Sequence, residues 1–373
     1  MKRSQTIGVL GGGQLGRMLA LAGYPLGLRF RFYDEVPDAP ASQVGELVVG
    51  RFDDGDALER FARGLDAVTY EFENVPVDAA ERLATVLPVY PPAGALAAAQ
   101  DRLHEKQMFV ELRVPTTRFV TVDAREQLDA AVRELGLPVV LKTRRHGYDG
   151  KGQAVVRTAD EVEPAWAALG AGTRALIAEE FVAFDRELSV LAVRGRDGAC
   201  GFYPLVENVH QRGILRLSRA PATDVAPAMQ DRAHARARAV MERTGYVGVL
   251  AIEFFERGGE LIANEMAPRV HNSGHWTIEG AAVSQFENHV RAVAGLPLGS
   301  CEARGWSAMV NIIGSPPTEA ATRELLTTPG GHLHLYGKEP RAGRKLGHVS
   351  LVAPTQEHAE RAAARLLTLC PMV

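Results

Sequence analysis

Apolar and polar positions alternate along the first hundred residues with two different periods. Short β-rich runs lie between segments whose apolar residues recur at helical spacing. We expect strands at 6–10, 29–33, 46–49 and 67–72, and helices at 14–24, 56–63 and 78–86. Strands that alternate with helices predict a parallel sheet covered by helices, which is a Rossmann-like α/β arrangement.

The pattern changes after the segment 90–94, Tyr-Pro-Pro-Ala-Gly, where proline and glycine end the first unit. A run rich in helix formers follows at 95–112, and then a compact block at 115–181 with the size of a separately moving lid. A third segment, 187–296, contains alternating strands, and a tail with β-rich runs closes the chain. The further elements that we expect are strands at 119–122, 138–142, 176–181, 308–313, 332–335 and 348–352, and helices at 124–135, 231–243 and 356–367.

These patterns predict an α/β fold, α+β overall, in three parts. We expect an N-terminal Rossmann-like domain at 1–97, a central domain at 98–296 whose lid subdomain spans about 113–183, and a small C-terminal β-rich domain at 297–373. A chain of 373 residues is long enough for two or three domains of ordinary size.

Composition and charge narrow the class of protein. Hydrophobic residues make up 46% of the chain and charged residues 23%, as in folded globular proteins. The formal net charge of −3 excludes the strong positive field of a nucleic-acid or anionic-membrane binder, and no uncharged apolar run approaches the ~18 residues of a membrane helix. Cys200, Cys301 and Cys370 lack metal-ligand spacing and fit a reducing compartment, so we expect a cytoplasmic protein.

Lysine is rare in this chain, because arginine supplies most of its 42 basic residues. This scarcity indicates that lysine is kept where arginine does not serve, since a compact ammonium fits among oxygens that exclude a planar guanidinium. The lysines are Lys2, Lys106, Lys142, Lys151, Lys338 and Lys345.

A glycine-rich turn follows the first predicted strand. Gly11 to Gly16 satisfies G-x-G-x-x-G between a strand and a helix, and Asp34 ends the next strand where a ribose-binding acid is expected. The motif is typical of dinucleotide binding. A tight turn next to another backbone or an anion also requires glycine, so both interpretations stay open.

A second glycine-rich loop lies in the lid. Lys142 ends a strand, and the loop that follows has glycines at 147, 150 and 152 and a second lysine at 151. Such a loop lays backbone N–H groups and a cation over a polyphosphate. Its spacing differs from that of a Walker A loop, and an exposed hairpin with solvated charges is the alternative.

Two apolar runs around a turn at 257–261 predict a hairpin with an unusual pair of acids. If the turn is centred on Gly259, Glu253 lies directly opposite Glu265, Asn264 points to the other face unless a bulge intervenes, and Phe255 and Ala263 share the side of the glutamates. Opposed carboxylates between apolar strands repel each other, and Mg²⁺ would remove that cost. The alternative is a register shift that exposes one glutamate.

Two further polar segments have more than one interpretation. The stretch from Glu179 to Glu187 connects two predicted sheets and is either a hinge that contacts adenine and ribose or an acidic surface linker. The histidines at 271–275 invite a zinc interpretation, but no H-E-x-x-H helix is present, and Arg, Lys and Asn favour a phosphate and bicarbonate pocket over metal. Solvated polar loops remain an alternative. The chain has neither a G-x-S-x-G elbow nor a cysteine placed as a nucleophile.

Taken together, the motifs resemble the 5-(carboxyamino)imidazole ribonucleotide synthases, ligases of purine biosynthesis in the ATP-grasp superfamily. The resemblance covers the chain from Ile7 to about Val352 and rests on the segments 11–18, 69–75, 99–106, 142–153, 179–182, 207–211 and 264–275. It implies an ATP-grasp fold in which ATP lies between the lid and the third segment. It also implies that the turn at Gly11 contributes to a ribonucleotide site and binds no nicotinamide. His146 departs from the pattern, because a small residue is expected there.

The resemblance also implies roles for individual residues. The ATP-binding residues would be Arg102, Lys142, Gly147, Tyr148, Asp149, Gly150, Lys151, Gly152, Gln153, Glu179, Glu180, Phe181, Val182, Glu187, His210, Asn264 and Glu265. The Mg²⁺ ligands would be Glu253 and Glu265. The substrate-binding residues would be Gln14, Tyr148, Asp149, Arg269, His271, Asn272, Arg344 and Lys345, with Asp149, Arg269 and Lys345 catalytic.

The implied reaction is an ATP-dependent carboxylation by a homodimer. Bicarbonate would attack the γ-phosphorus of ATP to form carboxyphosphate. Carboxyphosphate, or CO₂ released from it, would carboxylate the exocyclic amine of 5-aminoimidazole ribonucleotide while Asp149 accepts a proton. Three alternatives remain open: another ATP-grasp ligase of the formate-dependent transformylase or biotin carboxylase type, a dinucleotide-binding oxidoreductase, and a non-catalytic scaffold.

Overall fold

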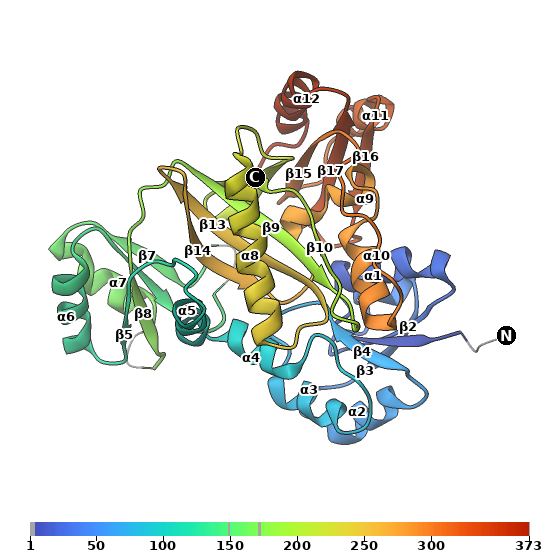
Figure 1. The fold of residues 1–373 in the computed structure, drawn as a ribbon, viewed down its shortest axis with the longest axis horizontal. Helices are drawn as coiled ribbons and strands as arrows, with labels where there is room; N and C mark the ends of the chain where they lie inside the picture. Colours follow the sequence, from blue (N-terminus) through green and yellow to red (C-terminus); the bar gives the residue numbers. More distant parts are fainter. Residues whose placement is uncertain (1–3, 148–149, 171–172, 373) are drawn as a thin grey trace.

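The N-terminal part is a parallel sheet between helices, as the sequence predicts (Figure 1). This computed structural model describes residues 4–147, 150–170 and 173–372. Strands run in the order β3-β2-β1-β4 and pair in parallel. Their bounds are β1 Thr6–Leu10, β2 Arg29–Asp34, β3 Glu46–Val49 and β4 Ala67–Tyr70, and the helices are α1 Gln14–Gly23, α2 Gly55–Ala62 and α3 Val77–Ala84. The carboxyl ends of β1 and β4 therefore lie side by side at one edge.

The helix-rich run at 95–112 forms two helices, α4 Ala93–Gln100 and α5 Arg102–Glu111. Asp101 separates them because its backbone is extended and its carboxylate accepts the N–H of Leu103 at 3.0 Å. The same buried carboxylate accepts two hydrogen bonds from the guanidinium of Arg144 in the lid, at 2.7 and 2.9 Å. The break thus places Arg102 at the start of a helix, beside the loop that follows the lid strand β6 Val139–Thr143.

The lid has an antiparallel sheet and a hydrophobic core of its own, and it projects to one side of the molecule (Figure 1). Its strands run in the order β5-β8-β6-β7. Their remaining bounds are β5 Phe119–Val122, β7 Gln153–Val156 and β8 Leu176–Glu180, and the helices are α6 Arg125–Leu135 and α7 Val162–Ala168. A separate core, which includes Val122, Leu128 and Leu141, is what a lid needs in order to move as a unit.

One antiparallel sheet forms the centre and continues into the C-terminal part. Its order is β14-β13-β9-β11-β12-β15-β17-β16, with β10 paired to β9. The strands are β9 Arg186–Arg194, β10 Cys200–Phe202, β11 Val206–Gln211, β12 Ile214–Ala220, β13 Gly248–Arg257, β14 Glu260–Ala267, β15 Trp306–Ile313, β16 Gly331–Leu335 and β17 Lys345–Ala353. Because β12 pairs with β15, the backbone ladder crosses the boundary expected at 296–297.

Helices cover both faces of the central sheet and connect it to the N-terminal part. α8 Pro227–Arg243 packs against β9, β13 and β14. α10 Gln285–Ala294 packs against α1, and one hydrophobic core joins Ile7 and Leu19 to Phe286 and Val290. The remaining helices are α9 Thr277–Gly280, α11 Glu319–Thr327 and α12 Gln356–Leu369, with short 3-10 turns η1 Tyr24–Leu26, η2 Pro40–Gln43, η3 Ala159–Glu161 and η4 Asn272–Gly274. Among the described residues, no helix is both long and apolar enough to cross a membrane.

Candidate active site

A cleft of about 780 Å³ opens where the N-terminal part, the lid and the central sheet meet. Most of the residues that the sequence assigned to ATP, metal and substrate line it. On the nucleotide side these are Arg102, Lys142, Gly147, Gly150, Lys151, Gln153, Glu179, Glu180, Phe181, Val182, Glu187, His210, Asn264 and Glu265. Elsewhere they are Gln14, Glu253, Arg269, His271, Asn272, Arg344 and Lys345. Gly152 is not part of the lining, and Tyr148 and Asp149 lie outside the described residues.

The acidic hairpin has the predicted pairing at its centre. Glu253 on β13 lies opposite Glu265 on β14. A bulge follows, so that Phe254 pairs with Ala263, and Asn264 is the extra residue on β14. The bulge explains why Asn264 and Glu265 both line the cleft although they are consecutive in the sequence.

The bulge corrects two expectations about this hairpin. Pairs nearer the turn are centred between Gly258 and Gly259, not on Gly259. The prediction that Ala263 shares the side of the glutamates is wrong: Ala263 packs with Phe254 in the hydrophobic core, whereas Phe255 lines the cleft. An inserted residue shifts the alternation of faces by one, which strict period-two reasoning misses.

Burial and neighbouring charges shift the pKa values of the two glutamates in opposite directions. Burial, and then the charge of Glu265, raise the pKa of Glu253 to about 7. Burial also opposes the ionisation of Glu265, but the guanidinium of Arg102, 2.7 Å away, outweighs it and lowers the pKa of Glu265. A divalent cation between these two carboxylates would relieve their repulsion, and oxygen ligands would fit Mg²⁺.

Two lysines meet one buried carboxylate at the back of the cleft. The ammonium of Lys142 lies 3.1 Å from Glu179 and donates to the side-chain oxygen of Asn264 at 3.3 Å. Lys106 is fully buried and contacts the other oxygen of Glu179 at 3.1 Å. Burial of Glu179 opposes its charge, but Lys106 and Lys142 outweigh burial and lower its pKa. Glu179 therefore anchors Lys142 on β6, the strand that precedes the glycine-rich loop.

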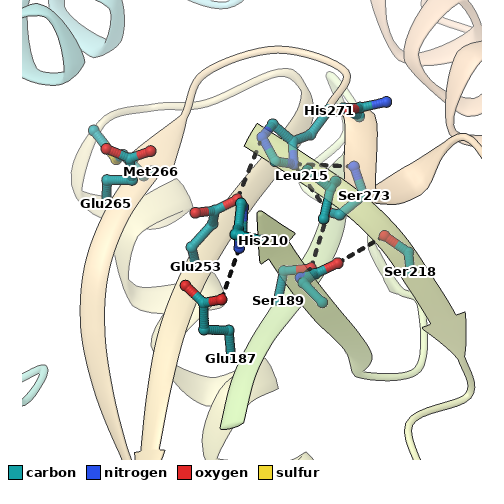
Figure 2. Close-up of polar contacts among 12 residues, drawn as sticks. Glu187, Ser189, His210, Leu215, Ser218, Glu253, Glu265, Met266, His271 and Ser273 are labelled. Atoms are coloured by element: carbon teal, nitrogen blue, oxygen red, sulfur yellow. Dashed lines mark hydrogen bonds and ion pairs between the residues drawn. The ribbon is translucent and has the colours of Figure 1, made fainter. Parts of the chain in front are cut away.

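The connection between β8 and β9 brings an aromatic ring and a carboxylate beside the cleft. Phe184, just after β8, stacks on Phe255 with ring centroids 4.8 Å apart. At the start of β9, Glu187 contacts the Nδ1 atom of His210 at 2.7 Å (Figure 2). Burial lowers the pKa of His210, but the bond to Glu187 and the charge of Glu253 outweigh it, so the net shift is upward.

The glycine-rich loop after β6 lies against the central sheet at Gly150. A Cβ atom added to Gly150 would lie 2.9 Å from the Cα atom of Gly213, in the turn between β11 and β12, and Gly150 has a positive φ of 74°. Glycine at 150 thus permits close contact between lid and body. His146 has a φ of 62°, a left-handed conformation, so the residue that departs from the family pattern occupies a sharp turn at the start of the loop.

The glycine-rich turn at Gly11 to Gly16 is filled by carboxylates of the protein itself. Glu71, directly after β4, accepts the N–H of Gly13 at 2.7 Å and of Gly16 at 2.9 Å, and Asp34 accepts the N–H of Gly12 at 2.6 Å. A Cβ atom at Gly13 would overlap the carboxylate of Glu71. The backbone N–H groups that bind a pyrophosphate in dinucleotide-binding proteins donate here to Asp34 and Glu71. The glycine motif therefore no longer supports the oxidoreductase alternative.

The opposite end of the cleft is basic. Arg269 forms an ion pair with Glu73. Burial opposes the negative charge of Glu73, but Arg269 outweighs burial and lowers the pKa of Glu73 to about 2. Asn272 and Asn311 exchange hydrogen bonds through their side-chain amides at 2.7 and 3.1 Å. Lys338, Arg344 and Lys345 line the same end.

Sequence reasoning missed several residues of this cleft. Glu71 and Glu73 lie in the segment 69–75, which the sequence analysis used only as one of the motifs that resemble the family. Their position at the end of a predicted parallel strand is the signal that would have identified them as site residues. Glu105 carried no assigned role: it accepts the N–H of Met266 at 2.5 Å, and burial raises its pKa to about 8. Asn311 is buried behind the cleft and does not line it; it had no sequence signal, because its role depends on the contact with Asn272.

The fold and the cleft define an ATP-grasp enzyme, with a lid and a central sheet around an acidic pair and a phosphate loop. Family models agree in order along the chain. Residues 4–100 match the ribonucleotide synthetase preATP-grasp domain, 107–286 the ATP-grasp domain, and 307–362 the phosphoribosylaminoimidazole carboxylase C-terminal domain.

Whole-chain comparisons specify the family. N5-carboxyaminoimidazole ribonucleotide synthase from Pseudomonas aeruginosa is 52% identical over 345 residues, 92% of this chain and 94% of that protein. The crystal structure of the synthetase from Thermus thermophilus is 60% identical, with a TM-score of 0.93 over 98% of this chain and 99% of that one. The Aspergillus clavatus enzyme, solved with ADP and 5-aminoimidazole ribonucleotide, is 33% identical, with a TM-score of 0.91 over 99% of both chains. The chain belongs to the N5-carboxyaminoimidazole ribonucleotide synthase family.

Proposed function

We propose that this enzyme uses ATP and bicarbonate to carboxylate 5-aminoimidazole ribonucleotide, giving 5-(carboxyamino)imidazole ribonucleotide in purine biosynthesis. The observation that carries the proposal is the facing pair of Glu253 and Glu265, which lies between a phosphate-type loop and a basic pocket in a member of this family. That order of groups suits transfer of a phosphoryl group from a nucleotide to a small anion.

ATP binds between the lid and the central sheet in this proposal. Lys142 and Arg102 face its phosphates, the loop at 147–153 covers them, and the hinge at 179–182 with Glu187 and His210 holds the nucleoside. The burial of Lys142 supports this role, because an ammonium removed from water interacts strongly with an incoming phosphate. The enzyme of Aspergillus clavatus has been solved with ATP.

Mg²⁺ is held by Glu253 and Glu265, with Asn264 beside them. The unequal neutralisation of the two carboxylates supports this assignment, because Arg102 pairs with Glu265 while Glu253 keeps a raised pKa. Bound there, the ion neutralises charge on the phosphates during transfer. The protein's own part is to present two carboxylates from paired strands, whose register fixes their spacing.

The chemistry proceeds in two steps. A bicarbonate oxygen bonds to the γ-phosphorus as the bond to the ADP oxygen breaks, which leaves carboxyphosphate and ADP. The exocyclic amine then bonds to the carboxyl carbon, phosphate departs, and the amine loses a proton. Arg269 and Lys345 hold the bicarbonate and acyl oxygens, and His271 lies beside them in the substrate pocket. Asp149, which lies outside the described residues, is our candidate for the group that accepts the proton.

Substrate binding falls to the N-terminal and C-terminal parts. Gln14, at the start of α1, contacts the ribonucleotide together with Asn272. Its phosphate is bound by Arg344 and Lys345. The reciprocal amide pair of Asn272 and Asn311 supports a fixed orientation for Asn272. Contact between the loop at Gly150 and Gly213 supports a lid that excludes water, which an acyl phosphate requires.

Domain boundaries, location and assembly are also part of the proposal. We retain a division at 1–97, 98–296 and 297–373, with a lid at about 113–183. The free cysteines support the reducing cytoplasm as the site of action. The homodimer rests on the resemblance of the motifs, and light scattering tests it: a mass near the 40.3 kDa of one chain would contradict it.

One experiment tests the reaction. ADP release is followed with ATP, Mg²⁺ and bicarbonate, with and without 5-aminoimidazole ribonucleotide. We expect strong stimulation by the ribonucleotide and formation of an acid-labile carbamate from labelled bicarbonate. Stimulation only by biotin, or only by glycinamide ribonucleotide with formate, would refute the proposed substrate and identify a different ATP-grasp ligase.

A further inference from the structure

A chain of buried polar side chains runs beside Glu253, across the central strands β9, β11 and β12 (Figure 2). It starts on β12, passes through β11 and β9, and ends in the segment 271–273, where His271 faces Glu253 on β13. None of its inner members is more than 4% exposed. In order, the members are Ser218, Asn208, Ser189, Ser273 and His271.

The hydrogen bonds of this chain all run in one direction. The Ser218 hydroxyl donates to Oδ1 of Asn208 at 2.8 Å, and Nδ2 of Asn208 donates to Oγ of Ser189 at 2.9 Å. Ser189 donates to Oγ of Ser273 at 2.9 Å. The Ser273 hydroxyl then has its proton available for Nδ1 of His271, which lies 2.9 Å away.

The backbone decides which nitrogen of His271 carries the proton. The N–H of Ser273 also points at Nδ1 of His271, at 3.3 Å, and a backbone N–H is a donor only. Nδ1 is therefore the acceptor, which excludes both the imidazolium and the Nδ1–H tautomer. The proton lies on Nε2, and Nε2 lies 3.6 Å from Oε1 of Glu253.

The tautomer matters because of what faces Glu253. An Nε2–H group attracts the carboxylate and leaves metal binding to oxygen atoms alone. The opposite tautomer would direct a nitrogen lone pair at the carboxylate, which is repulsive, and would add an imidazole ligand that favours transition metals over Mg²⁺. Outer partners of this kind commonly set the orientation of a ligand residue.

We propose that Ser273, Ser189, Asn208 and Ser218 are positioning residues, which hold His271 as the Nε2–H tautomer and so orient Glu253 for an oxygen-only Mg²⁺ site. The inference rests on the proposed role of Glu253 in metal binding. It assigns a function to side chains that do not line the cleft, since Ser189, Asn208, Ser218 and Ser273 are absent from its lining.

The tautomer is measurable in the full-length enzyme without ligand. In ¹⁵N NMR of histidine-labelled protein, a neutral Nε2–H ring has a protonated Nε2 and an unprotonated Nδ1, and the signal that disappears in His271→Gln identifies the residue. We expect the Nε2–H form in the wild type. Observation of the Nδ1–H form or of an imidazolium near neutral pH would overturn the proposal, and this readout depends neither on metal nor on turnover.

The effect on the metal site is measured by binding. Ser189→Ala removes the donor in the middle of the chain, and Ser189→Thr restores a hydroxyl. Ser350→Ala is the matched control, because Ser350 is a buried serine on β17 whose hydroxyl has no hydrogen-bond partner among the described residues. Calorimetry with ADP, in the presence and absence of Mg²⁺, separates metal affinity from nucleotide affinity.

We expect Ser189→Ala to weaken the Mg²⁺-dependent part of ADP binding about 10-fold, to leave metal-free ADP binding within about 2-fold, and to add an Nδ1–H population at His271. Ser189→Thr should recover most of this loss, and Ser350→Ala should show none. Equal losses with and without Mg²⁺ would indicate general destabilisation and overturn the positioning role. A Glu253→Gln variant that keeps Mg²⁺-dependent binding would instead overturn the metal role of Glu253, and with it this inference about the metal, while the tautomer result would still stand.

Discussion

Lys106 offers a sharp test of why this chain keeps so few lysines. Its ammonium is fully buried and lies 2.9 Å from the Thr117 hydroxyl, 3.0 Å from that of Thr116 and 3.1 Å from the carboxylate of Glu179. These oxygens enclose a small cation. The perturbation is Lys106→Arg, a substitution that keeps the charge and uses the basic residue that the chain prefers elsewhere.

The structure gives the expected magnitude. A guanidinium is larger and planar, and no exposed surface is available to receive the excess volume, so overpacking should cost about 1–3 kcal/mol of unfolding free energy. Lys106→Met keeps the volume but leaves Glu179 with a single cationic partner, Lys142, and loss of a buried partner costs roughly 3–5 kcal/mol. The expected order of stability is therefore wild type, then Lys106→Arg, then Lys106→Met.

Urea unfolding followed by tryptophan fluorescence measures these differences, with ADP release as a second assay. Arg243→Lys is the matched control, because Arg243 and Glu111 form an exposed pair at 3.6 Å in which exchange should change stability by less than about 0.5 kcal/mol. If Lys106→Arg were as stable as the wild type, the argument that the site selects a compact ammonium would be refuted. If Lys106→Met were the more stable variant, the charge assigned to the contact with Glu179 would be wrong.

Three further predictions follow from other parts of the structure. Gly13→Ala should lower stability by about 1–3 kcal/mol in thermal unfolding, because the new Cβ would overlap the carboxylate of Glu71, whereas Gly94→Ala, with open space at its Cβ, should be nearly neutral; equal effects would contradict the close fit at Gly13. Glu265→Gln should reduce the rate of ADP formation by about 10²-fold or more, because it removes one of two facing carboxylates and the partner of Arg102; a rate within a factor of about three of the wild type would dismiss its metal role. His289 accepts the N–H of Val249 and contacts the Thr69 hydroxyl, and burial lowers its pKa to about 3, so its contribution to stability is present above the unfolded pKa near 6.5 and is lost as the pH falls toward 3. The unfolding free energy lost through His289 is about 2 kcal/mol at pH 5. In His289→Gln, the unfolding free energy measured with urea should therefore depend less on pH between 6.5 and 5. If its pH dependence were the same as in the wild type, His289 would not be the group responsible.

Much of the secondary structure follows from local pattern. The predicted strands at 6–10 and 46–49 coincide with β1 and β3, and the expected α/β fold with a lid and a β-rich C-terminal part is confirmed. Local signals were sufficient there because period-two and helical spacing report which face of an element is buried. The break at Asp101 was not anticipated, although Asp101 caps α5 locally; the contact that its carboxylate also makes with Arg144, 43 residues away, has no local signal.

The site illustrates the same division. Pairing of Glu253 with Glu265 follows from counting along a hairpin, because both residues belong to one turn and its register. The bulge that brings Asn264 to the same side is not visible in the pattern of apolar residues. The extent of the sheet beyond 296 was likewise missed, because the pairing of β12 with β15 joins residues about 90 positions apart.

The sequence by itself determined the order of elements, the acidic hairpin, the phosphate loop and the family to which these motifs belong, because each is encoded within a few dozen consecutive residues. The spacing of the glycines left two uses open for the turn at Gly11, and the tertiary structure decided which groups its amides contact. The amide N–H groups of a G-x-G-x-x-G turn can donate to either a pyrophosphate or a carboxylate. Here they donate to Glu71, which directly follows the neighbouring strand β4. The anion that binds a helix N-terminus is the one that lies close to it. Glu71 is 55 to 58 residues from Gly16 and Gly13 in the sequence, so only the fold brings its carboxylate to these amides.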